Sequence, residues 1–438
     1  MALANTFRSL GVYNYRLWAT GAFVSNIGTW MQRTAQDWIV LTELTQHNAA
    51  AVGITMALQF GPQVFLMTLT GWAADACDRR KLLIATQTAM GLLALILGVL
   101  ILTKTVELWH VYALALMLGI VAAFDAPARQ SFVSEVVDEA NLSNAVALNS
   151  ASFNSARMIG PAVAGVLINW TNSGWVFVIN AVSFVAMIAV MASLRRGELH
   201  SPKRSKRTVN GVSEGFRYVR ERPDLVSILL MLFIIGTFGL NFPIYISTMA
   251  VKIFHAGAGE YGLLTTFLAV GSVTGALLAA GRSEARVELL LLGAGLFGIG
   301  CGLAAIAPSY WIFAIILTGI GIAAQTFTTS TNAFVQVSTE PTMRGRVMAI
   351  LMAMLMGGTF IGAPIVGWVA DQCGPRAALG VGALAGIAAF AVGLRYLLVY
   401  RGLKVTFAGG KLQCVFAPNI APIPKDGVDQ TPVEEAAE

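Results

Sequence analysis

The chain has 438 residues, of which 56% are hydrophobic and only 12% are charged. A soluble domain carries about 25% charged residues to cover its surface, so this composition excludes an ordinary soluble protein and indicates lipid contact. The formal net charge is +6, but Lys and Arg lie in short segments between apolar runs, which argues against a nucleic-acid partner. The four cysteines are far apart and lack zinc-ligand spacing, so neither a metal site nor a disulfide framework is expected.

Apolar runs of about 20 residues, each long enough to cross a bilayer as a helix, recur along the whole chain. Helices are expected because lipid-exposed backbone must satisfy its own hydrogen bonds, and the runs are too long for barrel strands. We predict about twelve transmembrane helices, at residues 17–41, 50–74, 82–103, 109–129, 145–170, 174–194, 225–249, 258–280, 287–307, 309–332, 346–370 and 378–400.

The distribution of basic residues predicts the orientation of these spans. An even number of spans places both termini on one side of the membrane. If that side is the cytoplasm, only Lys104, Lys252 and Arg376 remain among the outer loops. The positive-inside rule therefore predicts a multi-pass protein with both termini in the cytoplasm.

A basic segment, residues 195–224, separates six predicted spans from six others. We interpret it as a cytoplasmic linker, with a lipid-headgroup or partner site as the alternative. The chain then divides into an N-terminal six-helix bundle (1–194), the linker and a C-terminal six-helix bundle (225–404). Residues 405–438 contain prolines and become acidic, so they are expected to form a disordered cytoplasmic tail.

The two predicted bundles are related in sequence. The segment IGPAVAG at 159–165 recurs as IGAPIVG at 361–367, and the same offset maps Trp109 onto Trp311. Any one match could be chance, but the shared offset favours duplication. Parallel six-span repeats with a substrate site between them are typical of alternating-access transporters. We therefore expect two pseudo-symmetric bundles around a central cavity.

The loop after the second predicted span has the sequence GWAADACDRRK at residues 71–81. Here Asp75 can pair with Arg79, four residues later, or face a helix N-terminus. The segment resembles the loop signature of the major facilitator superfamily, G-x-L-a-D-r-x-G-r-[RK], although Ala76 and Asp78 depart from it. The resemblance implies a charged latch that stabilises one conformation. The matching residues are Gly71, Asp75, Arg79 and Arg80.

The fifth predicted span contains ARMIGPAVAG at residues 156–165. Its small residues permit close helix packing, and Pro161 permits a kink because it lacks a backbone donor. The segment resembles the exporter-type motif of the same superfamily, G-x-x-x-G-P-x-x-G-G, through Gly160, Pro161 and Gly165, with alanine at two glycine positions. The resemblance implies efflux, and ordinary small-residue packing is the alternative.

Two further stretches, residues 25–38 and residues 124–130 followed by 145–150, resemble the enterobactin-exporter-like branch, which includes macrolide and multidrug efflux proteins. The resemblance covers nearly the whole chain except the tail. It implies a major facilitator fold in the cell membrane and export of a drug-like or siderophore-like molecule driven by the proton gradient. It implies no cofactor, and a monomer whose partners are a small-molecule substrate and the lipid bilayer.

Charged residues within spans are costly and are functional candidates. Arg33 and Asp37 are four residues apart in the outer half of the first span, on one helix face. Asp37 could carry a proton when Arg33 moves away, and a permanent structural pair is the equal alternative. Asp125 and Arg129 repeat the spacing near the cytoplasmic end of the fourth span, where Arg157 could join them. That position favours a gating salt bridge over a proton relay.

The tenth predicted span is rich in hydroxyl and amide side chains from residue 325 to residue 332, which favours a face turned toward a cavity. Aromatic residues could stack against an aromatic or cationic ligand, although helix packing is the alternative for each of them. The candidate cavity-lining residues are Trp30, Asn149, Asn154, Asn241, Tyr245, Gln325, Thr328 and Asn332.

These features favour a secondary active transporter, with proton-coupled efflux as the first hypothesis. Import or uniport of a small organic solute on the same fold is the alternative. A non-transporting receptor or scaffold would gain nothing from the charged residues within the spans. An enzyme is not expected, because the sequence has no Ser-His-Asp set, no paired histidine ligands and no Gly-rich phosphate loop.

Overall fold

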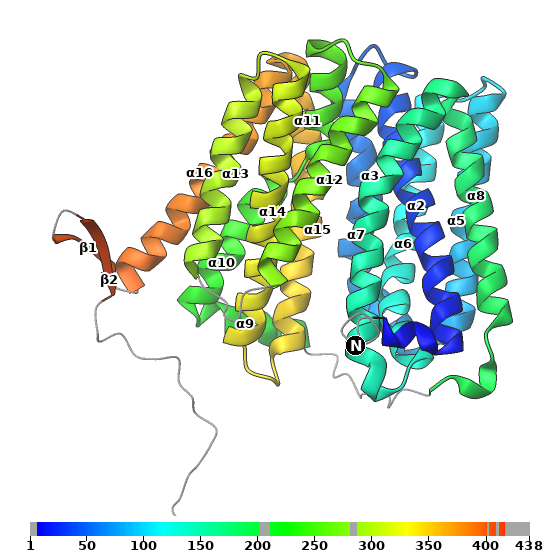
Figure 1. Ribbon diagram of the computed structural model, residues 1–438, viewed down its shortest axis with the longest axis horizontal. Coiled ribbons are helices and arrows are strands. Elements are labelled where there is room, and N and C mark those ends of the chain that lie inside the picture. The colour runs from blue at the N-terminus through cyan, green and yellow to red at the C-terminus, as the bar shows by residue number, and fades with distance from the viewer. Residues whose placement is uncertain (1–6, 201–210, 281–286, 401–402, 409–410, 417–438) are drawn as a thin grey trace, which may run out of the picture.

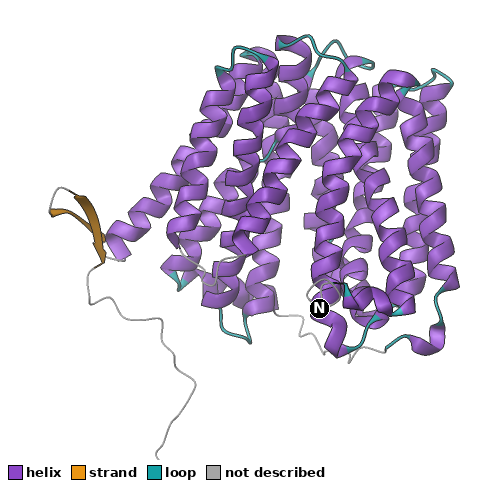
Figure 2. Cartoon of the chain, in the orientation of Figure 1, coloured by secondary structure: helices purple, strands orange, loops and turns teal. Residues whose placement is uncertain are grey.

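The computed structural model of the protein describes residues 7–200, 211–280, 287–400, 403–408 and 411–416. Helices account for nearly all of these residues, as Figure 2 shows. The helices before residue 200, called the first half below, are η1 (Arg8–Gly11), α2 (Tyr13–Thr42), α3 (Ala49–Phe65), α4 (Met67–Ala76), α5 (Arg79–Leu102), α6 (Leu108–Val136), α7 (Glu139–Trp170), α8 (Ser173–Ser193) and η2 (Arg196–Glu198). Those of the second half are α9 (Gly211–Arg220), α10 (Pro223–Ile234), η3 (Ile235–Gly239), α11 (Phe242–Thr248), η4 (Met249–Ile253), α12 (Ala258–Ala280), α13 (Val287–Ala305), α14 (Tyr310–Ser338), α15 (Arg344–Gln372) and α16 (Pro375–Tyr400).

Within the described residues, nine helices are long and apolar enough to cross a membrane. They are α5, α6 and α8 of the first half and, in the second half, residues 223–253 together with α12 to α16. The other predicted spans coincide with α2, with α3 and α4, and with α7. Of these helices, α2 and α7 are more polar, because they carry charged and amide side chains, whereas α3 and α4 are shorter. The predicted all-helical architecture is confirmed for the described residues up to Tyr400.

Two of the predicted spans are interrupted. The second span turns at Leu66, between α3 and α4, shortly after the helix-weakening Pro62. The seventh span changes from α-helix to the π-helical turn η3 and begins again at α11, where Pro243 lies in the first turn. At this break the side-chain amide of Asn241 donates to the carbonyl oxygen of Thr237 at 2.7 Å, so the interruption is stabilised locally.

The helices of the first half pack chiefly against one another, and so do those of the second half (Figure 1). The main contacts between the halves pair α3 with α15 and α7 with α12. Helices α3 and α15 approach closely because Gly367 has no side chain. A Cβ added at Gly367 would lie only 2.5 Å from the carbonyl oxygen of Ala49.

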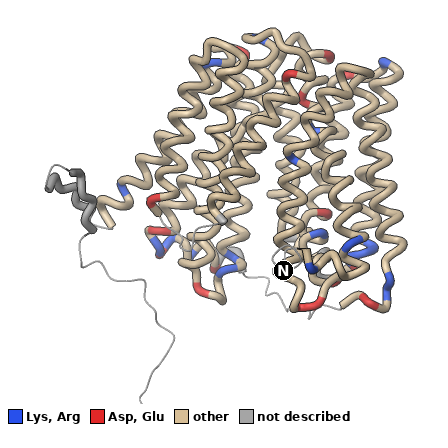
Figure 3. The backbone as a smooth tube through the Cα atoms, in the orientation of Figure 1, with Lys and Arg blue, Asp and Glu red and all other residues tan. Residues whose placement is uncertain are grey.

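Basic residues gather at one end of the helices, near the N-terminus, as Figure 3 shows. We call this end, where α2 begins at Tyr13 and α9 lies, the basic end. The far end, where α2 stops at Thr42 and α3 starts at Ala49, is called the opposite end.

The chain does not end in disorder immediately after residue 404. Strands β1 (Leu403–Ala408) and β2 (Lys411–Phe416) form an antiparallel hairpin in which Ala408 pairs with Lys411. The sequence here alternates apolar and polar residues on both sides of a Gly-Gly pair, which is a hairpin pattern. The prediction of a disordered tail from residue 405 did not take this pattern into account. Residues 417–438, the rest of the predicted tail, lie outside the described residues.

Candidate functional site

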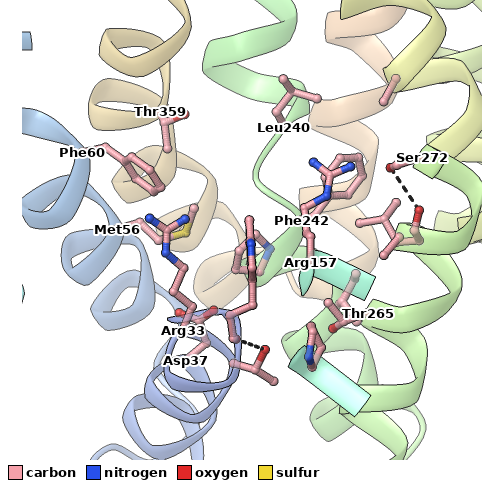
Figure 4. A pocket seen from close by; sticks show the side chains of 18 of the residues that line it. Arg33, Asp37, Met56, Phe60, Arg157, Leu240, Phe242, Thr265, Ser272 and Thr359 are labelled. Atoms are coloured by element: carbon pink, nitrogen blue, oxygen red, sulfur yellow. Dashed lines mark hydrogen bonds between the residues drawn. The ribbon is translucent and has the colours of Figure 1, made fainter. Parts of the chain in front are cut away.

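A pocket of about 460 Å³ lies between the two halves of the protein. Its walls come from α2, α3 and α7 of the first half and from α11, α12, α14 and α15 of the second. Three of the lining side chains carry a charge, and Figure 4 shows all three in the same pocket: Arg33, Asp37 and Arg157. The volume and the mainly apolar lining are typical of a small-molecule site.

The side chain of Arg33 is held by aromatic rings. Its guanidinium carbon lies 5.1 Å from the centroid of the Trp30 ring and 5.3 Å from that of Phe60. Asp37 follows one helical turn later, near enough for the opposite charges to interact, but no Arg33–Asp37 ion pair forms within 4 Å. The predicted pair therefore shares one pocket wall without a closed salt bridge, because cation–π contacts hold Arg33.

Asp37 also faces the second half of the protein. Its carboxylate lies next to the hydroxyl of Tyr261 on α12, and the Tyr261 ring stacks on Trp38 at 5.9 Å between centroids. The sequence analysis missed Tyr261. A phenol within an apolar span needs a polar partner, so it was a usable signal. The contact joins an acidic residue of one half to a proton donor of the other.

Arg157 lies in this pocket rather than with Asp125 and Arg129, where the sequence analysis had considered it. Among the described residues it has neither a hydrogen bond nor an ion pair. Two glycines that follow Arg157 on α7 explain its position. A Cβ at Gly160 would lie 2.5 Å from Cβ of Trp30, and one at Gly165 would lie 2.8 Å from the carbonyl oxygen of Ala258.

The exporter-type motif thus packs α7 tightly between α2 and α12, two walls of the pocket. Gly160 faces α2, whereas Gly165 faces α12, and the carbonyl oxygen of Pro161 approaches Gly262. Small residues at these crossings allow backbone to approach backbone. The motif therefore sets how the two halves meet beside the pocket.

Asp125 belongs to a separate, buried cluster within the first half. Its carboxylate accepts hydrogen bonds from Thr86 at 2.7 Å and Gln87 at 2.8 Å, and it pairs with Arg129 at 3.1 Å. The predicted spacing of four residues does produce an ion pair. The cluster joins α5 to α6 and makes no contact with the second half among these bonds.

Arg79 and Arg80 of the predicted loop signature bind helix ends at the basic end. Arg79 pairs with Glu135 at 2.8 Å, and Arg80 donates to the carbonyl oxygens of Met191 at 2.6 Å and Ala192 at 3.1 Å. These contacts place cations at the C-terminal ends of α6 and α8, where the helix dipole favours them. Gly71 lies on α4, and the side chain of Asp75 lies outside the described residues.

The predicted cavity residues divide into two groups. Trp30, Gln325 and Thr328 line the pocket. The others do not line it, and most of their amides bond to their own helices, as Asn154 does to Ser150 and Asn332 does to Thr328. Residues in the second group are Asn149, Asn154, Asn241, Tyr245 and Asn332. Lining residues that the sequence analysis did not select include Gln59, Phe153, Thr265, Ser272 and Thr359.

At the opposite end, an acidic residue of the second half bonds to the first half. The carboxylate of Asp371 on α15 accepts hydrogen bonds from the backbone N–H groups of Ala49 and Ala50, each at 2.8 Å. Lys252 of η4 pairs with the same carboxylate at 3.0 Å. A negative charge at the first turn of α3 is favourable, because the N–H groups there have no helical partner.

Comparisons with known proteins agree with this fold. The profile of the transmembrane secretion effector family matches residues 5–402. A staphyloferrin A transporter of Staphylococcus aureus is 25% identical, over 88% of this chain and 96% of the relative. A multidrug efflux pump of Mycolicibacterium fortuitum is 26% identical, over 81% of this chain and 89% of the relative. The solved structure of a nucleoside transporter has a TM-score of 0.68 at 12% identity, over 87% of this chain and 98% of the other.

The family profile spans almost the whole described chain, and the relatives are aligned over most of their own length. The likeness to the nucleoside transporter is a likeness of fold alone. The chain belongs to the transmembrane secretion effector family of major facilitator transporters, as the resemblance of its motifs predicted.

Proposed function

We propose that the protein is a secondary active exporter of small molecules that works by alternating access. About twelve spans would form two six-helix bundles, before and after the linker at 195–224, with the pocket between them. The protein would lie in the cell membrane as a monomer, with the basic end and both termini in the cytoplasm. Relatives that carry siderophores and drugs support a substrate of this size class.

The observation that carries this proposal is a charged pocket between two halves that are joined at the opposite end. Asp371 ties α15 to the first turn of α3 there, and Gly165 brings α7 against α12. If the opposite end is extracellular, this arrangement is the inward-facing state, in which a substrate enters from the cytoplasm. Export then requires that these contacts break and that the basic end closes.

Proton coupling is assigned to Asp37 in this proposal. Its carboxylate faces Arg33 on the same helix and Tyr261 on α12 of the other half. Protonation would remove the attraction to Arg33 and change the contact with Tyr261. A proton at this position could therefore alter how the two halves meet, which is what coupling requires.

Import or uniport on the same fold remains the second candidate, and the exporter-type motif at Gly160 and Pro161 is the feature that disfavours it. A receptor that does not transport is a weaker candidate, because it would have no use for charged residues in a pocket between the halves.

The experiment is proton movement in inverted membrane vesicles that contain the full chain. Addition of a macrolide, a catecholate siderophore, a cationic dye or an aromatic carboxylate should release protons from acidified vesicles for at least one compound. Asp37→Asn should abolish this release, whereas the matched Asp125→Asn variant, altered outside the pocket, should retain it. Normal release by Asp37→Asn would contradict the assignment of the proton site, and no release with any compound would contradict proton-coupled efflux.

A further inference from the structure

We propose that the pocket selects molecules with a single negative charge on an aromatic or apolar body, and that Arg157 is the residue that binds the acidic group. This inference rests on the proposed function, since it names the substrate class of the same pocket. Of the aromatic or cationic ligands that the aromatic residues had suggested, it keeps the aromatic body and excludes the positive charge.

The charges that line the pocket do not balance. Arg33 and Asp37 have opposite charges and lie one turn apart on α2, so they largely offset each other. Arg157 remains, and no acidic partner or hydrogen-bond acceptor contacts it among the described residues. A bound cation would add to this surplus of positive charge, whereas a monoanion would remove it.

The position of Arg157 makes the surplus significant. It lies near the middle of α7, which runs from Glu139 to Trp170, so its side chain cannot extend to either membrane surface. An unpaired charge at such a depth is unfavourable unless it meets water, a protein partner or a ligand. The pocket supplies room for a ligand at this point, since Arg157 is one of its lining residues.

The surroundings of Arg157 indicate the rest of the ligand. Phe153, one turn earlier on α7, also lines the pocket and contacts the Trp30 ring edge-to-face at 5.8 Å between centroids. Phe242 lies on the facing wall from α11 (Figure 4). A guanidinium can bind a carboxylate with two parallel hydrogen bonds, while the rings pack on a flat apolar body.

The charge balance also indicates how an anion would be driven outward. With Asp37 ionised and a monoanion bound, the pocket charges sum to zero, and after release the returning empty pocket carries a positive charge. An inside-negative membrane potential favours that return. A proton on Asp37 adds a second positive charge to the returning pocket, so the proton gradient and the membrane potential would act in the same direction.

The test measures binding to the full chain in lipid nanodiscs with three naphthalene probes of one shape: 2-naphthoate, 2-naphthylmethanol and 2-naphthylmethylammonium. Wild-type protein should bind the carboxylate roughly 10-fold or more tightly than the ammonium compound. Arg157→Gln should weaken binding of the carboxylate on the order of 10- to 100-fold while leaving the neutral alcohol nearly unchanged. Arg157→Lys should retain part of the preference, because it keeps the charge but not the planar geometry.

Arg217→Gln serves as the matched control, since Arg217 is exposed on α9 and is not among the residues that line the pocket. Equal or tighter binding of the ammonium compound would overturn the proposal. So would an equal loss for all three probes in Arg157→Gln, or no binding of any probe to the folded protein.

These results separate the inference from the proposed function. An anion preference that depends on Arg157, without outward transport in vesicles, would support the binding site and contradict the exporter. Outward transport of other compounds, without any anion preference, would support the exporter and contradict this inference.

Discussion

Asp371 offers a quantitative test of how the halves are held together. Its carboxylate accepts two backbone hydrogen bonds from α3 and pairs with Lys252, and its side chain is 19% exposed. Hydrogen bonds to a charged group contribute about 1.5–3 kcal/mol each, and partial exposure favours the lower end of that range. Asparagine would keep one acceptor oxygen but lose the charge. We therefore expect Asp371→Asn to destabilise the conformation closed at the opposite end by about 1.5–2 kcal/mol, which is roughly 10- to 30-fold in population.

The assay is the distance distribution between spin labels at Thr105 and Pro308, two exposed positions in loops of the first and second halves at the opposite end. Labels would be introduced by cysteine substitution after the native cysteines are replaced. Asp371→Asn should increase the fraction of long distances. Lys252→Gln should have a smaller effect, under about 1 kcal/mol, because a partly exposed ion pair contributes little. An unchanged distribution in Asp371→Asn, or a larger change in Lys252→Gln, would refute the assignment of the carboxylate as the main contact.

Two further predictions concern helix packing and the buried cluster. Gly165→Leu should reduce transport while the protein still inserts, because the leucine side chain would meet the carbonyl oxygen of Ala258, and overpacking costs about 1–3 kcal/mol. The measurement is the initial transport rate at matched expression, and a wild-type rate would contradict the prediction. Asp125→Ala should lower the thermal melting temperature of the purified protein, because it leaves Arg129 without its buried partner, a loss of about 3–5 kcal/mol. Asp125→Asn should have a smaller effect, and an unchanged melting temperature in Asp125→Ala would show that the cluster is not structural.

The sequence predicted the helices well because the length of an apolar run directly reflects the thickness of a bilayer. The predicted span at 258–280 coincides with α12, Ala258–Ala280. The break within the seventh span was not predicted, because 225–249 reads as one continuous apolar run. Its cause is local: Gly239 and Pro243 weaken the helical ladder between two apolar segments.

The candidate site was predicted less completely, because side-chain neighbours on different helices depend on how each helix is rotated. Spacing of four residues correctly brought Asp125 to Arg129, since both are on one helix. The same spacing placed Arg33 near Asp37 but could not show that Trp30 and Phe60 hold the guanidinium.

Contacts between the halves were beyond the sequence analysis for the same reason. Tyr261 meets Asp37, and Asp371 meets the start of α3, across more than two hundred positions of the chain. Arg157 lies in the pocket and not beside Asp125 and Arg129, which the sequence analysis had considered as its neighbours, because the sequence does not show how each helix is rotated. Gly160 and Gly165 determine the rotation of α7, because they pack against α2 and α12, but the sequence analysis identified them only as parts of a motif.

The central claim, outward transport, is tested most directly by the direction of substrate movement in energised vesicles. Inside-out and right-side-out vesicles from the same cells, with and without the protein, would be supplied with a macrolide, a catecholate siderophore and 2-naphthoate. We predict that at least one compound accumulates in the inside-out vesicles only when the protein is present and the membrane is energised. Accumulation confined to right-side-out vesicles would identify an importer and contradict the account.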